Sequence, residues 1–386
     1  MGLIVFCLSL CGFMVLAVMR VTDPILPIVA AEFGRTIGAA GIIVTAFSLP
    51  YGLFQLMFGP LGDRYGKLSV IVYTLGLSSV CTITAAFADS IEFLAAARFL
   101  SGLTTASAIP LSMAFIADNV DYAHRQPAIA RYFSGLILGQ ITGSSLGGIF
   151  ADLYGWRMIF VIFGVTTAIA TICLWFSCRN HTEVRTDTRF GKDFLKPYLN
   201  LLKLRKPRQV IITALIEGTV FFAGLAYIGA YLHLTFALSY AKIGLAVACA
   251  GFGGLLYIAV VKHIVRTLGE RGMIQSGGLV MAAGFVTLVF IPSPGWSFPL
   301  LLVTGFGMYI MHNTLQTIAT EIAPHARGTA ISLFAFVLMT GQGIGVALYG
   351  YIIDEYGFRP AYILAAAVIA LLATWFQSTL KTSQTG

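Results

Sequence analysis

The chain has 386 residues, of which 58% are hydrophobic and only 10% are charged, with a net charge of +8 and a mean hydropathy of +0.87. Soluble domains carry roughly 25% charged residues, so this composition excludes a soluble globular protein and requires lipid contact over most of the surface. The basic excess lies mainly in residues 179–208, where it predicts an anchor against anionic membrane lipid and not a nucleic-acid-binding surface.

Uncharged runs predict the membrane spans, since a spanning helix needs about 20 apolar residues. The runs cover 1–19, 36–62, 68–88, 99–117, 132–151, 158–178, 218–241, 243–261, 272–320, 328–353 and 360–380. The longest, 272–320, is broken by Pro292, Pro294 and Gly295, which predicts a tight turn between two spans. The sequence therefore predicts an all-α membrane protein with twelve transmembrane helices in two six-helix domains.

Charged residues of the first domain are predicted to gather near the outer end of the membrane. Arg20 and Asp23 in span 1 share a helical face through their i, i+3 spacing, and Arg98 lies at a similar depth in span 4. Intramembrane charges are costly and are functional candidates by default. One interpretation is a proton-coupling site in which Asp23 titrates beside Arg98, and the other is a structural ion network at the outer rim.

The loop after span 2, residues 59–67, reads GPLGDRYGK. Asp63 is expected to accept hydrogen bonds from a neighbouring helix N-terminus, where the backbone dipole favours an anion. Arg64 and Lys67 are expected to pair with acids at the domain edge or to face lipid phosphate. One interpretation of this loop is a charged segment that only fixes topology.

Span 5 contains a segment that recurs in span 11. Residues 139–157 read GQITGSSLGGIFADLYGWR, residues 341–359 read GQGIGVALYGYIIDEYGFR, and nine of the nineteen positions are identical. The identical pairs are Gly139/Gly341, Gln140/Gln342, Gly143/Gly345, Leu146/Leu348, Gly148/Gly350, Asp152/Asp354, Tyr154/Tyr356, Gly155/Gly357 and Arg157/Arg359. With six spans per half, the two copies are parallel repeats about an axis along the membrane normal, as in many membrane transporters.

Small residues at helical spacing allow two helix backbones to touch. The glycines of the repeat are therefore interpreted either as static packing or as a sliding interface between the domains. The residues assigned to this domain interface are Gly139, Gly143, Gly147, Gly148, Gly341 and Gly345.

The domain limits follow from the central basic segment. The N-terminal domain is predicted to cover 1–178, the cytoplasmic linker 179–208 and the C-terminal domain 209–386, with a short amphipathic helix on the membrane surface at 191–204. With a cytoplasmic N-terminus, 18 of the 24 Lys and Arg residues fall in cytoplasmic loops and tail. Both termini are therefore predicted to be cytoplasmic, in a bacterial inner (plasma) membrane.

Polar residues inside the second domain are the other site candidates. Glu217 is the only carboxylate inside span 7 and is interpreted as a proton or cationic-substrate site, with a structural hydrogen bond as the alternative. His312, Asn313 and Gln316 lie mid-span in span 10, and His312 and Gln316 share a face. They are expected either to line a cavity or to hydrogen-bond between helices.

Three segments resemble the major facilitator superfamily. Residues 59–67 match its signature G-x-L-x-D-R-x-G-R/K, and residues 98–106, RFLSGLTTA, look like its R-x-x-x-G motif. Residues 139–148 are similar to the antiporter motif G-x-x-x-G-P-x-x-G-G, with Ser144 in place of proline. The chain is identified as a member of this superfamily, most like its twelve-span drug:proton antiporter branch. The resemblance implies that the 59–67 loop is a conformational latch that holds the outward-facing state, and that two domains rock about a midplane cavity. The residues assigned to the latch are Gly59, Asp63, Arg64, Gly66 and Lys67.

These features predict a proton-driven exporter of small organic solutes by alternating access, acting as a monomer with membrane lipid, protons and substrate as its partners. Proton-linked uptake or symport of a small metabolite is the alternative, with Arg20 and Arg98 as the residues that would bind an anionic one, and a non-transporting receptor or scaffold is a remote alternative. No Walker A loop, zinc motif, nucleophile elbow or catalytic triad is present in the sequence. An enzyme is therefore not expected, nor is a cofactor or metal.

Overall fold

The computed structural model describes residues 2–181, 183, 195–321 and 327–382, and within those ranges it contains helices and no strands. Helices satisfy the main-chain N–H and C=O groups within one segment, which lipid requires. The N-terminal half consists of α1 (Gly2–Arg20), α2 (Leu26–Glu32), α3 (Ile37–Ala40), α4 (Ile42–Tyr65), α5 (Lys67–Ala85), α6 (Ile91–Thr105), α7 (Ala108–Asn119), α8 (Tyr122–Tyr154) and α9 (Trp156–Cys178). The predicted all-α class is confirmed.

A short connecting helix, α10 (Lys196–Lys203), precedes the C-terminal half. That half consists of α11 (Arg205–Glu217), the π-helix η1 (Gly218–Phe222), α12 (Ala223–Phe236), α13 (Tyr240–Leu288), the 3-10 turn η2 (Pro294–Trp296), α14 (Ser297–Glu321), α15 (Arg327–Tyr356) and α16 (Phe358–Thr382). The turn η2 lies where the prolines of the long uncharged run predicted a break. Helix α10 lies within the predicted 191–204 helix, of which 191–194 fall outside the described residues.

Ten helical segments of the described chain are long and apolar enough to cross a membrane. One of them, α13, holds two spans, because Gly269 interrupts it with φ 59° and ψ 174°. Helix α14 has 25 residues and adds another span, although His312 and Asn313 make its middle polar. Counting both gives the predicted twelve spans, six in each half.

Positive-φ glycines mark equivalent turns in the two halves. Gly66 and Gly269 have φ of 98° and 59° at the turns after the second span of each half. Gly155 and Gly357, with φ of 80° and 85°, separate the fifth and sixth spans of each half. L-residues rarely adopt this backbone region, so glycine is the residue that forms these turns without strain. The duplication seen in the sequence thus extends to backbone geometry.

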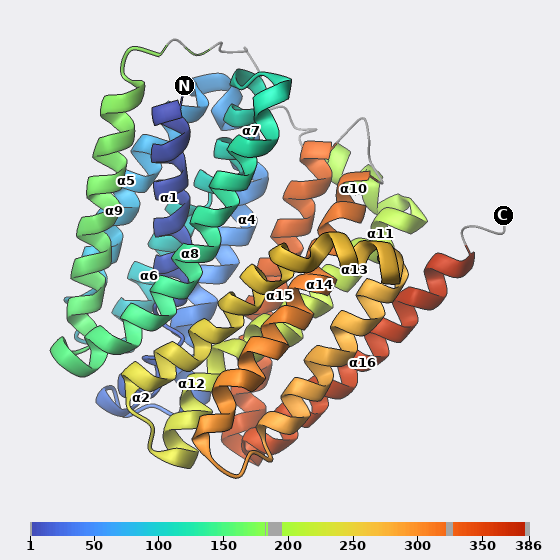
Figure 1. The fold of residues 1–386 in the computed structure, drawn as a ribbon. Coiled ribbons are helices and arrows are strands. Elements are labelled where there is room, and N and C mark those ends of the chain that lie inside the picture. The colour runs from blue at the N-terminus through green and yellow to red at the C-terminus, as the bar shows by residue number, and fades with distance from the viewer. Residues whose placement is uncertain (1, 182, 184–194, 322–326, 383–386) are drawn as a thin grey trace.

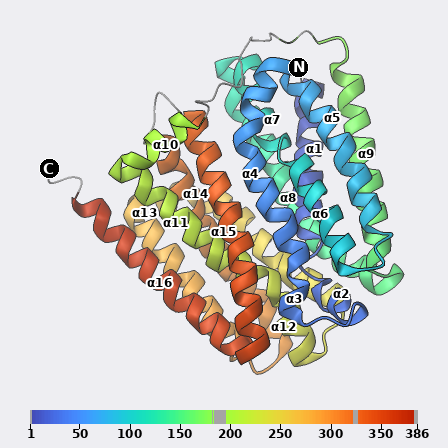
Figure 2. The same ribbon diagram turned by 180° about the vertical axis from the view of Figure 1, so that it is seen from behind.

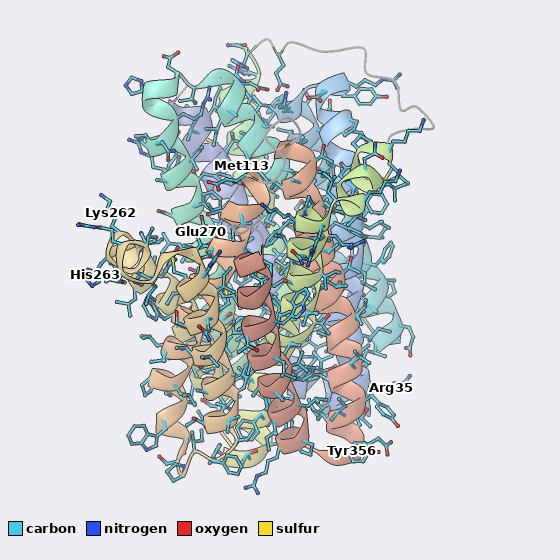
Figure 3. All side chains as sticks on the ribbon, turned by 90° about the vertical axis from the view of Figure 1, so that its right-hand side faces the viewer. Arg35, Met113, Lys262, His263, Glu270 and Tyr356 are labelled. Atoms are coloured by element: carbon cyan, nitrogen blue, oxygen red, sulfur yellow. The ribbon has the colours of Figure 1, made fainter. Side chains whose placement is uncertain are left out.

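The two halves lie side by side and meet mainly along two helix pairs. Helix α8 packs against α13, and α4 against α15 (Figures 1 and 2). We call the end that carries the N-terminus and α10 the linker side, and the end with Gly155 and Gly357 the far side. Figure 3 shows Arg35 and Tyr356 at the far side, while Lys262, His263 and Glu270 project near the kink of α13. The hydrogen bonds that join α3 to α15 and α8 to α13 lie at the far side.

The glycine stripes of spans 5 and 11 pack inside their own halves and do not face each other. A Cβ on Gly139 or Gly143 would collide with a carbonyl oxygen of α1. A Cβ on Gly341 or Gly345 would collide with a carbonyl oxygen of α11 or η1. This differs from the predicted interface between the domains. The reason is that each stripe serves the close crossing of the fifth span with the first span of the same half.

The other two glycines of the predicted interface divide between these environments. Gly147 faces Val21 and Pro24 of its own half. Gly148 faces the opposite half, where a Cβ would collide with the carbonyl oxygen of Tyr240 at the start of α13. Of the span 5 glycines assigned to the domain interface, Gly148 is therefore the one that faces the opposite half.

Candidate functional site

Glu217 and His312 form a buried pair in the C-terminal half. Glu217 ends α11 and is 1% exposed, and its Oε2 lies 3.3 Å from Nδ1 of His312 on α14. The other carboxyl oxygen, Oε1, is buried without a hydrogen-bond partner. An unpaired buried acceptor is costly, so this atom is available to a proton or to a donor brought by a ligand. The imidazole is the one side chain that ordinarily changes charge near neutral pH.

A π-helix begins directly after Glu217. The segment η1 covers Gly218–Phe222, and a Cβ on Gly218 would collide with the carbonyl oxygen of Leu338 on α15. The missing side chain thus lets the first and fifth spans of this half touch beside the carboxyl group. Single π turns occur frequently at functional sites. This turn carries Phe222 to a position 6.1 Å, centroid to centroid, from the His312 ring.

Phe222 also connects the two halves of the molecule. The guanidinium of Arg20, from α1, lies 5.0 Å from the centre of the Phe222 ring. Arg20 is 2% exposed, so this cation–π contact is largely desolvated. The Phe222 ring therefore lies between the guanidinium of Arg20 in the N-terminal half and the imidazole of His312 in the C-terminal half.

Arg20 and Asp23 form the ion pair that their spacing predicted. Nη1 of Arg20 and Oδ2 of Asp23 are 3.5 Å apart, and both side chains are at most 2% exposed. Neither carboxyl oxygen of Asp23 makes a hydrogen bond, and the same holds for Nε and Nη1 of Arg20. Electrostatic attraction thus holds the pair, and the buried donors of Arg20 and acceptors of Asp23 named above have no hydrogen-bond partner.

Arg98 is fixed differently. Its Nη1 donates to the carbonyl oxygen of Val18 at 3.0 Å, its Nε donates to that of Ile43 at 3.4 Å, and it stacks 4.2 Å above the Phe47 ring. Arg98 lies close enough to interact electrostatically with Asp23, although no ion pair joins them among the described residues. Its contacts tie together the first, second and fourth spans.

The remaining polar candidates lie around the C-terminal pair. Asn313 is half-buried beside the hydroxyl of Tyr257, and Gln316 is half-buried one helical turn from His312 toward the linker side. Gln342 on α15 is 1% exposed, and its Oε1 has no hydrogen-bond partner, whereas its repeat equivalent Gln140 is 8% exposed. Among the described residues, the second half thus offers two buried acceptors without a hydrogen-bond partner, Oε1 of Glu217 and Oε1 of Gln342.

Residues 59–67, predicted as a loop, are the last turns of α4, the break at Gly66 and the first residue of α5, and their charged side chains cluster within the N-terminal half. Nζ of Lys67 lies 3.2 Å from Asp63 and 2.9 Å from Asp118 at the end of α7. Asp63 therefore pairs with Lys67 and not with a helix N-terminus as expected. Arg64 lies over the ring of Tyr65.

Gly66 and Glu183 determine the backbone conformation between α4 and α5. Gly66 adopts its positive φ directly before α5, and the carboxylate of Glu183 accepts a hydrogen bond from the N–H of Leu68 at 3.0 Å. A Cβ on Gly59 would meet open space, so no close helix approach occurs at that glycine. In this conformation, the described contacts of the loop are made within the N-terminal half and the start of the linker.

The structure thus brings together Glu217 with His312 and Arg20 with Asp23, and it joins the two pairs through Phe222. Sequence reasoning missed Phe222 because a phenylalanine in an apolar span carries no chemical signal of its own. The glycine that follows Glu217 was the available signal for an irregular helix. The described residues contain no group of three or more His, Cys, Asp or Glu side chains that could hold a metal ion. The arrangement suits proton exchange and the binding of a charged or hydrogen-bonding solute.

Comparisons with known proteins agree over nearly the whole chain. A family model described as the Major Facilitator Superfamily matches residues 8–345. The uncharacterized MFS-type transporter YceJ of Bacillus subtilis (strain 168) is 25% identical over 364 residues, which cover 94% of this chain and 92% of that protein. The quinolone resistance protein NorA of Staphylococcus aureus (strain MRSA252) is 26% identical over 373 residues, 93% of each chain.

Solved structures show a similar fold. The bacterial homolog of the human lysosomal transporter Spinster, in an inward-facing and unoccupied conformation, matches with a TM-score of 0.79 at 18% identity. The match covers 98% of this chain and 96% of that one. At this identity, the similarity supports a shared fold of two six-helix halves.

Proposed function

Because the chain belongs to the major facilitator superfamily of membrane transporters, we propose that it exports a small organic solute across a bacterial inner membrane in exchange for protons. The observation that carries the proposal is the Glu217–His312 pair, with one carboxyl oxygen bonded and the other unpaired. A drug-resistance relative among the similar proteins supports the export direction.

The pair gives a physical basis for exchange. When Glu217 is ionised, its buried charge requires a cation, which is either protonated His312 or a positively charged group of the solute. When Glu217 takes up a proton, that requirement ends and the bound cation is no longer held. Proton and solute therefore compete for the same carboxyl group, which is the condition for coupled antiport. The aromatic rings of Phe222 and Phe334 beside His312 provide apolar contact for the rest of the solute.

The proposal is tested with purified protein in liposomes, under an imposed pH gradient, against a panel of organic cations and neutral drugs. We expect Glu217→Gln to abolish pH-driven flux of a cationic solute while retaining membrane insertion, because the neutral amide mimics the protonated carboxyl group, which no longer holds the cation. Loss of the carboxyl group should lower the pH-driven rate at least about 100-fold, which is the lower end of what a positioned acid or base contributes to a proton-transfer step.

The matched control is Asp23→Asn, which removes the rival buried carboxylate. We expect this variant to keep a pH-dependent rate, because Asp23 is already paired with Arg20. If Asp23→Asn loses the pH dependence and Glu217→Gln keeps it, the coupling site lies in the N-terminal half and our assignment is wrong.

A second candidate function is proton-linked uptake of an anionic metabolite. The supporting observation is that Arg20 and Arg98 place two buried cations beside the single carboxylate of Asp23, and that donors of Arg20 lack hydrogen-bond partners. An inward proton gradient would then drive the solute into the liposome instead of out of it. The direction of solute movement under that gradient separates the two functions.

A further inference from the structure

Two carboxylates on the far side reach across the boundary between the halves. They are Asp152 at the end of α8 and Asp354 at the end of α15, an identical pair in the sequence repeat. We propose that these two residues form a symmetric gate, in which each carboxylate caps the first turn of a helix in the opposite half and holds the far side closed.

Asp152 caps the start of α13. Its Oδ1 accepts a hydrogen bond from the N–H of Tyr240 at 3.1 Å, and its Oδ2 accepts one from the N–H of Ala241 at 2.7 Å. These N–H groups belong to the first turn, where a helix has no internal acceptors for them. The N-cap residue of α13, Ser239, bonds the N–H of Lys242, so Asp152 satisfies the donors that the helix's own cap leaves open.

Asp354 makes the equivalent contact with the start of the second span. Its Oδ1 accepts from the N–H of Gly38 at 2.9 Å, and its Oδ2 accepts from the hydroxyl of Thr36 at 2.6 Å. Thr36 is the N-cap of α3, and its hydroxyl oxygen accepts from the N–H of Ala39. Helices α3 and α4 form one continuous span, Ile37–Tyr65, so the capped terminus is that of a full membrane helix.

The backbone lies close enough at both positions for these bonds because a glycine stands one turn before each aspartate. A Cβ on Gly148 would collide with Tyr240, and a Cβ on Gly350 would come within 2.7 Å of Cα of Gly38. The two seams therefore share a glycine crossing followed by a capping carboxylate, related by the pseudo-twofold axis of the repeat.

These contacts differ from ordinary helix caps because each of them joins opposite halves. Rocking of the halves that opens the far side must break all four hydrogen bonds, whereas caps inside one half move with it. Their energy therefore enters the equilibrium between far-side-closed and far-side-open states directly. The helix dipole favours the same arrangement, since each carboxylate meets the positive end of its partner helix.

Hydrogen exchange in the intact protein tests the gate, with each aspartate read out at the seam that it does not touch. Asp152→Ala should speed amide exchange at the segment around Gly38, and Asp354→Ala should speed it around Tyr240. We expect about a fivefold increase from either change, which corresponds to the roughly 1 kcal/mol of a helix cap. Because both act on one opening equilibrium, the double variant should give about 25-fold at the two seams.

Asp152→Asn and Asp354→Asn should give smaller increases, since the amide keeps one carbonyl acceptor. The control is Glu355→Gln, which removes an exposed charge adjacent to Asp354 and is expected to leave exchange unchanged at both seams. If each alanine variant speeds exchange only at the helix start that it caps, the carboxylates are local caps and the gate is refuted. An unchanged rate at both seams refutes it as well.

Discussion

In the N-terminal half, the buried guanidinium of Arg98 is held by two backbone carbonyls and an aromatic face, whereas in the C-terminal half the buried carboxyl of Glu217 has a single partner and an open oxygen. Both groups lie inside six-helix bundles of the same plan. The difference indicates a division of roles, with a cation fixed into the frame of one half and a carboxyl group free to change its partner in the other. In our proposal, the repeated helices form the moving frame, and residues that differ between the halves carry the proton exchange.

Arg98 gives the largest test of this difference. We expect Arg98→Met to lower the free energy of unfolding by about 3 kcal/mol, because it removes the hydrogen bonds to the carbonyl oxygens of Val18 and Ile43 and takes the nearby cation away from Asp23. Thermal unfolding in detergent, followed by the loss of monodisperse protein, measures the effect.

Two variants sharpen the result. Arg131→Met removes an exposed cation on the linker-side part of α8 and should leave the unfolding temperature nearly unchanged. Adding Asp23→Asn to Arg98→Met should recover part of the lost stability, because the uncompensated carboxylate is then neutral. A destabilisation that is equally large for Arg131→Met would contradict the fixed-cation role.

Phe222 tests the connection between the halves at a smaller scale. We expect Phe222→Leu to slow pH-driven transport about fivefold, as the loss of roughly 1 kcal/mol of cation–π contact with Arg20 implies. The pH dependence itself should remain, since Glu217 and His312 are unchanged. Initial rates of flux in liposomes across a pH series provide the measurement.

Phe221→Leu is the matched control for this prediction. Phe221 is the neighbouring residue of the same π-helix and stacks on Phe285 within its own half. It loses the same number of atoms without touching a guanidinium. Equal slowing of transport in the two variants would mean that packing, and not the contact across the boundary, limits the rate.

The smallest expected effect lies at the far-side rim of the N-terminal half. Glu32 is partly exposed, and although burial acts in the opposite direction, hydrogen bonds from Trp156 and Arg157 hold its pKa below the ordinary value of 4.5. The ionised group therefore stabilises the fold at neutral pH, and this contribution is lost as the pH falls below 4.5 through the folded-state pKa. Glu32→Gln should cost less than about 1 kcal/mol at pH 7, since solvent screens the pair.

The difference in unfolding temperature between Glu32→Gln and the native protein, measured from pH 7 to pH 4, checks the sign. We expect the difference to shrink toward the acid end. A gap that widens on acidification would show that the carboxylate is not stabilised by its partners.

The sequence predicted the architecture well, because spans leave a long-range signal in the spacing of charges. The prolines and glycine at 292–295 marked a turn correctly, and the motif at 59–67 indicated the superfamily that the family model confirms. The buried positions of Arg20, Asp23 and Arg98 also follow from their place beside long apolar runs, within the predicted spans.

Partners were harder to predict than positions. Glu217 and His312 are 95 residues apart, and nothing in one sequence says which faces of spans 7 and 10 meet. The glycine stripe of span 5 showed that some helix comes close, but spacing alone did not distinguish α1 of the same half from a helix of the other. Asp152 and Asp354 were visible as an identical pair, yet their role depends on helix ends that lie far away in the chain.

The paired turns at Gly66 and Gly269, and at Gly155 and Gly357, make this chain its own replicate in a mutational scan. A side chain introduced at either member of a pair meets nearly the same backbone demand, so the shared part of the penalty is measured twice. What differs within a pair then reports local surroundings, such as the Glu183 carboxylate that a Cβ at Gly66 would meet and one at Gly269 would not. The pattern of tolerated substitutions should therefore repeat along the chain at an offset of 202 to 203 residues. Positions at which the pattern does not repeat are those where the two halves have specialised.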